Sequence, residues 1–121
     1  MGALPNAILH GFYRSESDGT ARKHMGQSVY FTRRSPSKGL VRVFAHSLPT
    51  NCRYSVDVLW SHDGVSWNTI TGLQNITTED ESSTEVALSM GRYFKLLLSV
   101  DDSTASAMLE AELSGWLSFR P

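Results

Sequence analysis

A run of alternating side chains, interrupted by one Asp-Gly turn, constrains this chain more than any other feature. Residues 53–71 read RYSVDVLWSHDGVSWNTIT. Before the turn, every second residue is apolar or aromatic: Tyr54, Val56, Val58 and Trp60. After the turn the alternation resumes with Val65, Trp67 and Thr69. A period of two is typical of a strand with one buried face, and Asp-Gly between two such runs is the strongest short-range signal for a β-hairpin. The sequence therefore predicts an antiparallel sheet, with Trp60 in its core.

Short apolar stretches separated by turn-forming clusters recur along the rest of the chain, as in all-β sandwiches. We expect further strands at residues 7–13, 28–33, 40–47, 83–89 and 92–100, and a long exposed loop at 14–27. The clearest buried strand is 92–100, whose apolar residues share one face: Phe94, Leu96, Leu98 and Val100. A length of 121 residues suits one domain. We therefore expect a single domain over residues 1–121, an antiparallel β-sandwich of about eight strands.

The last segment, residues 105–119, fits either a helix or a strand. It contains good helix formers, and Ser103 or Thr104 could cap such a helix. Every second residue is also apolar, as a strand would require: Ala107, Leu109, Ala111 and Leu113. Because the preceding elements read as strands, we favour a strand here, with the helix as the alternative.

Composition limits the compartment and the partners. Cys52 is the only cysteine, so an intrachain disulfide is excluded, and synthesis in a reducing compartment is favoured. Residues 1–14 do not read as a signal peptide, and no apolar run approaches the roughly 18 residues of a membrane span. A net charge of −1 points to neither a nucleic-acid nor a membrane partner. We expect the chain to be made in the cytoplasm and to leave only inside a larger particle.

Charge is distributed unevenly along the chain. Residues 1–60 carry eight Lys and Arg against three Asp and Glu, whereas residues 61–121 carry three against nine. Two interpretations stay open: the halves pair within one domain, or copies of the chain contact one another head to tail. In the second case the rim of the protein interface would be formed by a basic cluster and an acidic run: Arg33, Arg34, Lys38, Glu79, Asp80 and Glu81.

Sites for catalysis or metals are not apparent. Ser61-His62-Asp63 has the three residue types of a hydrolase triad, but adjacent side chains in a turn diverge, so a polar turn explains them better. The four histidines lack the spacing of zinc ligands, both among themselves and relative to Cys52. We therefore expect no enzyme activity, no metal and no cofactor.

The tryptophans offer one possible ligand site. An exposed indole ring can stack on the apolar C–H face of a sugar. Trp60 is in phase with the buried positions of its strand, and Trp67 is expected to pack over the hairpin. Sugar stacking at Trp67 stays open as the alternative to packing.

Three segments, SVDVLWSHDGVSWNTI, GRYFKLLLSV and ASAMLEAELSGWL, together resemble a pattern found in small β-sandwich proteins. The pattern covers about residues 53–117 and consists of a strand, Ser-x-Asp-Gly-x-x-Trp, a strand that opens with Arg-Tyr, and a last alternating strand. The matching positions are Ser61, Asp63, Gly64, Trp67, Arg92, Tyr93 and Lys95. It occurs in discoidin-like, galactose-binding-like sandwiches and in short phage proteins that look like virion components.

This resemblance implies a jelly-roll or galactose-binding-like sandwich. Discoidin domains are usually longer, disulfide-closed and secreted, so the phage setting fits this chain better. It implies a non-enzymatic virion structural protein, a capsid decoration or head- or tail-associated protein that is made in the host cytoplasm. Its partners would be other virion proteins, contacted as a homo-oligomer or in many copies. The alternative is a discoidin-like carbohydrate-binding module.

Overall fold

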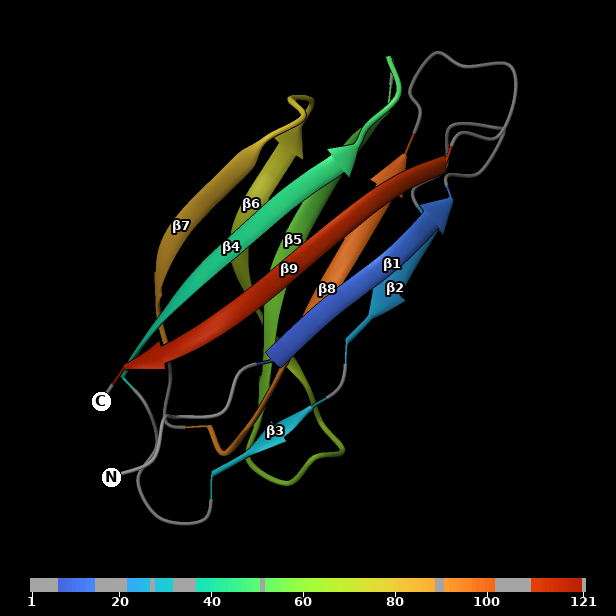
Figure 1. Ribbon diagram of the computed structural model, residues 1–121. Coiled ribbons are helices and arrows are strands. Elements are labelled where there is room, and N and C mark those ends of the chain that lie inside the picture. Colours follow the sequence, from blue (N-terminus) through green and yellow to red (C-terminus); the bar gives the residue numbers. More distant parts are fainter. Residues whose placement is uncertain are drawn as a thin grey trace.

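The structure is a computed structural model that describes residues 7–14, 22–26, 28–31, 37–50, 52–88, 91–101 and 110–120. Within these ranges every regular element is a β-strand (Figure 1). In chain order the strands are β1 (Ala7–Arg14), β2 (Arg22–Met25), β3 (Val29–Tyr30), β4 (Lys38–Ser47), β5 (Arg53–Ser61), β6 (Asn68–Ile76), β7 (Glu81–Ala87), β8 (Tyr93–Asp101) and β9 (Glu110–Arg120). The prediction of an all-β chain is confirmed.

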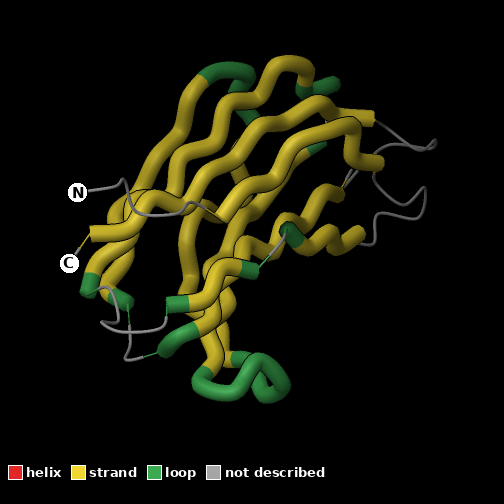
Figure 2. Tube along the Cα trace, turned by 60° about the horizontal axis from the view of Figure 1, so that its bottom comes forward, coloured by secondary structure: helices red, strands yellow, loops and turns green. Residues whose placement is uncertain are grey.

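The strands form two antiparallel sheets that lie face to face (Figures 1 and 2). The four-stranded sheet has the order β1-β9-β4-β7, and the five-stranded sheet has the order β2-β8-β5-β6, with β3 also paired to β8. β2 and β3 pair with successive parts of the same strand, because β2 lies opposite residues 97–100 and β3 opposite residues 93–94. Counted as one interrupted strand, they give eight strand positions in the order of a jelly roll. The predicted β-sandwich is therefore confirmed.

Two predicted elements differ from the structure near the N-terminus. The loop expected at residues 14–27 is wrong at residues 22–25, which form β2. The strand expected at 28–33 is two residues long within the described part, as β3. The rest of these predictions, at residues 15–21, 27 and 32–33, lies outside the described residues. The four residues of β2 show no apolar alternation. Their strand arises from pairing, because the edge of β8 presents backbone N–H and C=O groups that a neighbouring strand satisfies.

The ambiguous C-terminal segment is a strand where the structure describes it, as β9. Its inward positions are buried: Ala111, Leu113, Leu117 and Phe119. β9 lies between β1 and β4 and pairs with both along most of its length. Its alternate apolar residues are all buried against the core in a strand. This packing outweighs the local helix propensity of the segment.

The core lies between the two sheets and is filled by every second residue of the central strands. Besides β9, these residues are Val41, Val43 and Ala45 from β4, Tyr54, Val56 and Val58 from β5, and Phe94, Leu96, Leu98 and Val100 from β8. Burial of each such apolar side chain contributes roughly 1.5–3 kcal/mol. Trp60, expected in the core, is only partly buried and packs against the margin of the core.

β6 departs from regular pairing in two places. Its register with β5 shifts between Tyr54 and Val56 and again between Val56 and Val58, so β6 contains extra residues relative to its partner. At the second shift Gly72 lies so close to β5 that an added Cβ would be 2.3 Å from the carbonyl oxygen of Val56. The Asp57 carboxylate accepts a hydrogen bond from the Gly72 N–H at 3.2 Å. Only glycine allows this close approach of two backbones.

We expect Gly72→Ala to destabilise the fold by about 3 kcal/mol, because the new methyl group would meet rigid backbone rather than a movable side chain. Urea unfolding of the purified chain measures this. The matched control is Thr71→Ala at the neighbouring exposed position, where we expect a change below about 1 kcal/mol. Equal stability of the two variants would contradict the close approach.

Candidate functional site

The residues predicted as an interface rim lie in two different situations. Arg33 and Arg34 lie outside the described residues. Lys38 begins β4, and its Nζ lies 3.8 Å from Glu85 Oε1 on β7. Lys38 therefore takes part in an exposed ion pair between two strands. Such a pair contributes about 1 kcal/mol or less to the stability of the fold.

The acidic run is engaged within the chain. Glu79 Oε1 accepts a hydrogen bond from the Leu48 N–H at 3.0 Å, and the Asp80 carbonyl accepts one from the Ala45 N–H at 3.0 Å. Asp80 has a φ of 153°, a backbone conformation that residues with a side chain rarely adopt. These contacts fasten the turn before β7 to β4. A role in a protein interface stays a prediction for these residues.

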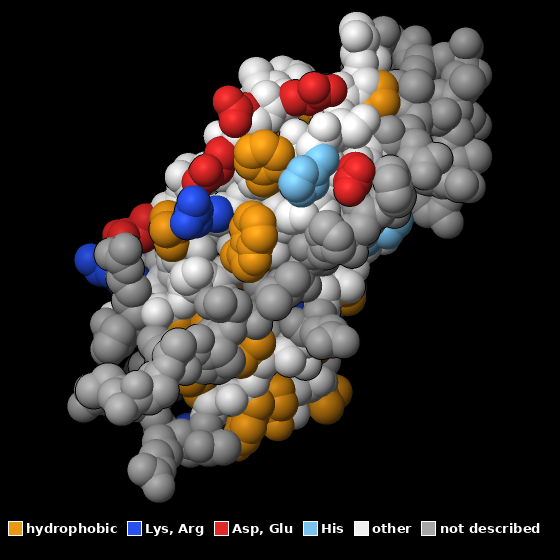
Figure 3. Space-filling model, in the orientation of Figure 1, with side chains coloured by type: hydrophobic (Ala, Val, Ile, Leu, Met, Phe, Trp, Pro, Cys, Tyr) orange, Lys and Arg blue, Asp and Glu red, His pale blue; other side chains and the backbone are white. Residues whose placement is uncertain are grey.

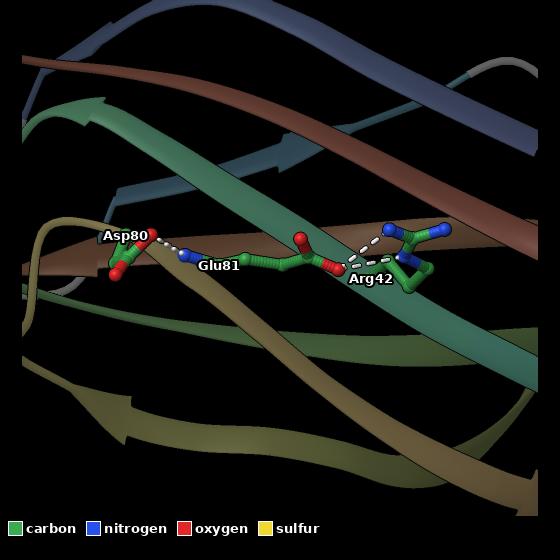
Figure 4. Close-up of polar contacts among 3 residues, drawn as sticks. All are labelled: Arg42, Asp80 and Glu81. Carbon is green, nitrogen blue, oxygen red and sulfur yellow. Dashed lines mark hydrogen bonds and ion pairs between the residues drawn. The ribbon is translucent and has the colours of Figure 1, made fainter.

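Glu81, the third acid of the run, forms an ion pair with Arg42 of β4 (Figure 4). Arg42 donates from Nε and Nη2 to the same oxygen, Glu81 Oε1, at 2.9 and 2.6 Å. The Asp80 carboxylate accepts a hydrogen bond from the Glu81 N–H at 2.8 Å and so helps to fix the backbone of Glu81. Because both bonds converge on one oxygen, Glu81 Oε2 and Arg42 Nη1 have no partner among the described residues.

This ion pair borders a shallow groove on the outer face of the four-stranded sheet. The groove has a volume of about 370 Å³ and is lined by Arg42, Phe44, His46, Glu81, Ser114 and Trp116. We call it the β4–β9 groove, after the two strands that supply most of its lining. Figure 3 shows hydrophobic, basic and histidine side chains gathered over these strands, with acidic side chains along the β7 side.

The floor and walls of the β4–β9 groove are held by contacts between neighbouring side chains. His46 Nε2 and Ser114 Oγ are hydrogen-bonded at 2.9 Å, and the rings of Phe44 and His46 have their centroids 4.7 Å apart. Ser114 is buried although it points to the outer face of the sheet. The groove is therefore a preformed surface, with two aromatic rings and several hydrogen-bonding groups.

Sequence reasoning did not single out the β4–β9 groove. The pattern did contain one signal: Phe44 falls on the polar side of the β4 alternation, opposite Val43 and Ala45, where a large apolar side chain must be exposed. Trp116 occupies the same kind of position in β9. Strand pairing brings the two together, because Arg42 lies opposite Trp116 and Phe44 opposite Ser114.

A second surface lies on the outer face of the five-stranded sheet, and we call it the aromatic surface. Tyr30 and Tyr93 are adjacent across β3 and β8, with ring centroids 4.6 Å apart, and Tyr93 meets Trp67 edge-on at 6.4 Å. Lys95 Nζ lies 4.1 Å from the centroid of the Trp67 ring, a cation–π geometry. Trp67 is thus packed within the protein against Lys95 and Tyr93, and sugar stacking there stays a prediction.

The aromatic surface also exposes apolar side chains. Met25 is 61% exposed, Tyr30 49% and Val65 80%. Met25 lies opposite Leu97 on the outer side of β8, and Val65 belongs to the loop between β5 and β6. Such side chains are enriched in the cores of protein interfaces, so this surface is suited to contact with another protein.

The residues of the supposed triad form the turn of the β5–β6 hairpin. The Ser61 hydroxyl donates to Asp63 Oδ1 at 3.0 Å and accepts from the Gly64 N–H at 2.9 Å, while the ring of His62 packs edge-on against Trp60. The backbone N–H groups of Ser66 and Val65 also donate to the Asp63 carboxylate, and together these bonds lower the pKa of Asp63 to about 2. The loop is longer than a tight turn, since β6 begins only at Asn68.

The described residues offer neither a metal-binding cluster nor a membrane-spanning helix. Among the described parts of the chain, no three His, Cys, Asp or Glu side chains gather in a way that could hold a metal ion. Cys52 is buried in the core. The described residues also contain no helix with the length and apolar character needed to cross a membrane.

Comparison with known proteins identifies the fold but no sequence relatives. No protein-family model and no curated protein match the chain. The VP2 subviral particle of infectious bursal disease virus matches with a TM-score of 0.65 and 13% identity, over 97% of this chain and 33% of that chain. Structures of the Gx and Gt strains of the same virus match with TM-scores of 0.61 and 0.60, identities of 12% and 8%, and coverage of 97% and 98% of this chain and 33% and 32% of theirs.

This chain therefore spans about a third of the length of the viral chains that it matches. At such low identity the likeness shows a shared fold. The chain is a β-sandwich that resembles a domain-sized part of proteins from viral particles.

The low pKa of Asp63 gives the β5–β6 loop a pH dependence that can be measured. A carboxyl group whose folded pKa lies below its ordinary value of 3.8 stabilises the folded loop above about pH 4, and this contribution is lost as the pH falls toward 2. We expect the amide proton shifts of Val65 and Ser66 to titrate with a midpoint near 2 by NMR. The titration should vanish in Asp63→Ala and persist in Glu85→Ala. A midpoint at the ordinary value would contradict the hydrogen-bonded turn.

Proposed function

We propose that this chain is a non-enzymatic structural protein of a virion, of the capsid decoration or head- or tail-associated type, which acts through protein–protein contacts. The observation that carries the proposal is the β-sandwich fold, which matches the VP2 subviral particle structure over 97% of this chain. The fold alone does not determine function, so the proposal also depends on the surfaces of this chain.

The aromatic surface is the proposed contact with the particle. The rings of Tyr30, Tyr93 and Trp67 already contact one another in the isolated chain, and Lys95 lies against Trp67. Side chains that are ordered before binding lose less conformational entropy when they bind. Met25 extends the surface along β2 as an exposed, adaptable apolar side chain.

Many copies on one particle would make such a surface effective. A single contact of modest size is weak, but repeated and symmetric attachment multiplies its effect. The chain would be made in the host cytoplasm, incorporated into virions and used without a cofactor.

The carbohydrate-binding alternative has an observation of its own. The β4–β9 groove, on the opposite sheet, combines exposed aromatic rings with hydrogen-bonding groups. It is independent of the aromatic surface, so the two activities can be separated by mutation.

Deletion of the coding sequence from the virus tests the structural role. We expect particles without the protein to lose infectivity and release their genome at a lower temperature or after milder osmotic shock than complete particles. Unchanged particle stability would count against the proposal.

Complementation with variants tests the aromatic surface. A double variant, Met25→Ser with Tyr30→Ala, should be incorporated at least about tenfold less than the parent chain, because both side chains are exposed and belong to the proposed contact. The control is Ser83→Ala, an exposed position on the opposite sheet, and we expect normal incorporation. Normal incorporation of the double variant would show that another surface attaches the protein.

A further inference from the structure

Two aromatic rings lie exposed and close together on the outer face of the four-stranded sheet. Trp116 is 38% exposed and Phe44 is 36% exposed, on neighbouring strands. Arg42 is the direct partner of Trp116 and Phe44 is that of Ser114, so the two rings are diagonal neighbours across the β4–β9 pair. Diagonal neighbours are about 7–8 Å apart at the backbone, within reach of large side chains. Together they form an apolar platform on the outer face of this sheet.

Hydrogen-bonding groups flank this platform in complementary pairs. Arg42 Nη1 is a donor and Glu81 Oε2 is an acceptor, and neither has a partner among the described residues, as Figure 4 illustrates for the ion pair. The ion pair itself holds both side chains in place before any ligand arrives. Neighbouring hydroxyl groups of a sugar both donate and accept, so they match a fixed donor beside a fixed acceptor.

The charges around the β4–β9 groove select against anionic ligands. Arg42 and Lys38 are paired with Glu81 and Glu85 across the β4–β7 pair. Further described acidic residues lie at the ends of these strands: Glu79 and Asp80 just before β7, and Glu112 in β9 opposite Ser47. Figure 3 shows acidic side chains along the β7 side of the hydrophobic ones and next to a histidine side chain. An anionic sugar would be repelled by this surface, whereas a neutral one would not.

We propose that the β4–β9 groove binds a neutral hexose unit of a glycan, with Trp116 as the stacking platform and the Arg42–Glu81 pair as the hydroxyl-binding group. An apolar C–H face of the sugar would cover the indole ring and release its water. The volume of about 370 Å³ lies at the low end of the roughly 300–1,000 Å³ typical of ligand pockets, which suits a short stretch of glycan.

This site differs from the one considered at Trp67. The Trp67 ring already has Lys95 over one face and is in contact with the Tyr93 ring, so part of its surface is used within the protein. Trp116 borders an open groove instead. The two tryptophans therefore serve as a matched pair in the test, with Trp116 as the site and Trp67 as its control.

The experiment is a titration of the full chain followed by NMR, with the three tryptophan indole N–H signals assigned. The neutral probes are cellopentaose, mannopentaose and galactotriose, and the anionic probe is trigalacturonic acid. We expect at least one neutral probe to shift the Trp116 signal and leave the Trp67 signal in place. Trp116→Ala should weaken the binding at least about tenfold and Trp116→Phe less, while Trp67→Ala should bind as the parent chain does.

A second variant keeps the test valid if Trp116→Ala fails to fold. Arg42→Gln removes the charge of an exposed side chain, so we expect the fold to be kept. The affinity for the same neutral probe should fall roughly several-fold. Circular dichroism of each variant monitors folding.

Three results would overturn the proposal. They are no shift with any neutral probe at its solubility limit, tighter binding of trigalacturonic acid than of the neutral probes, and neutral-sugar binding that Trp116→Ala and Arg42→Gln leave unchanged. The titration uses the isolated chain and the incorporation assay uses particles. Failure of glycan binding therefore leaves the structural role standing, and failure of incorporation leaves the groove standing.

Discussion

The packing of the two inner sheet faces against each other is the interaction on which the rest of this structure depends. β5 and β8 bury alternate residues from one side, and β4 and β9 bury alternate residues from the other. Once these positions are committed to the core, the intervening residues must point outward, whatever their chemistry. This explains why Phe44 and Trp116 stand on an exposed surface: their strands are held in register by their buried neighbours.

Much of the fold could be predicted from the sequence, because alternation is a local property. The burial of Val56 and Val58, and of Leu96 and Leu98, follows from a period of two within each strand. β2 could not be predicted in this way, because its strand depends on the edge of β8, far away in the chain. The extra residues of β6 were equally hidden, since a bulge is defined only relative to a partner strand.

The candidate site was harder to predict than the fold. The acidic run is conspicuous in the sequence as a charge cluster. In the structure, however, Glu79 accepts a hydrogen bond from the Leu48 N–H and Glu81 forms an ion pair with Arg42. The β4–β9 groove combines residues far apart in sequence, so no local motif marks it. Trp67 belonged to a recognisable motif, and its contacts with Tyr93 and Lys95 explain the motif by packing. The local motif in this chain thus specifies the β5–β6 hairpin. The exposed surfaces are assembled by the pairing of strands that are far apart in the sequence.

The two outer faces differ in character, and this difference underlies the functional account. The five-stranded sheet presents aromatic rings in mutual contact and exposed apolar side chains, and the four-stranded sheet presents an aromatic groove beside an ion pair. We propose that the first face attaches the protein to a particle and the second face binds sugar. A thin sandwich can carry both, because its core separates the two faces (Figure 2).

Whether this chain is a virion component can be measured by quantitative mass spectrometry of virus particles purified from cultures that express it. If the proposed function is right, the protein is present at a fixed copy number relative to the major capsid protein, and repeated purification does not change this ratio. Absence from purified particles, or a ratio that falls with each purification step, would contradict a structural role in the virion.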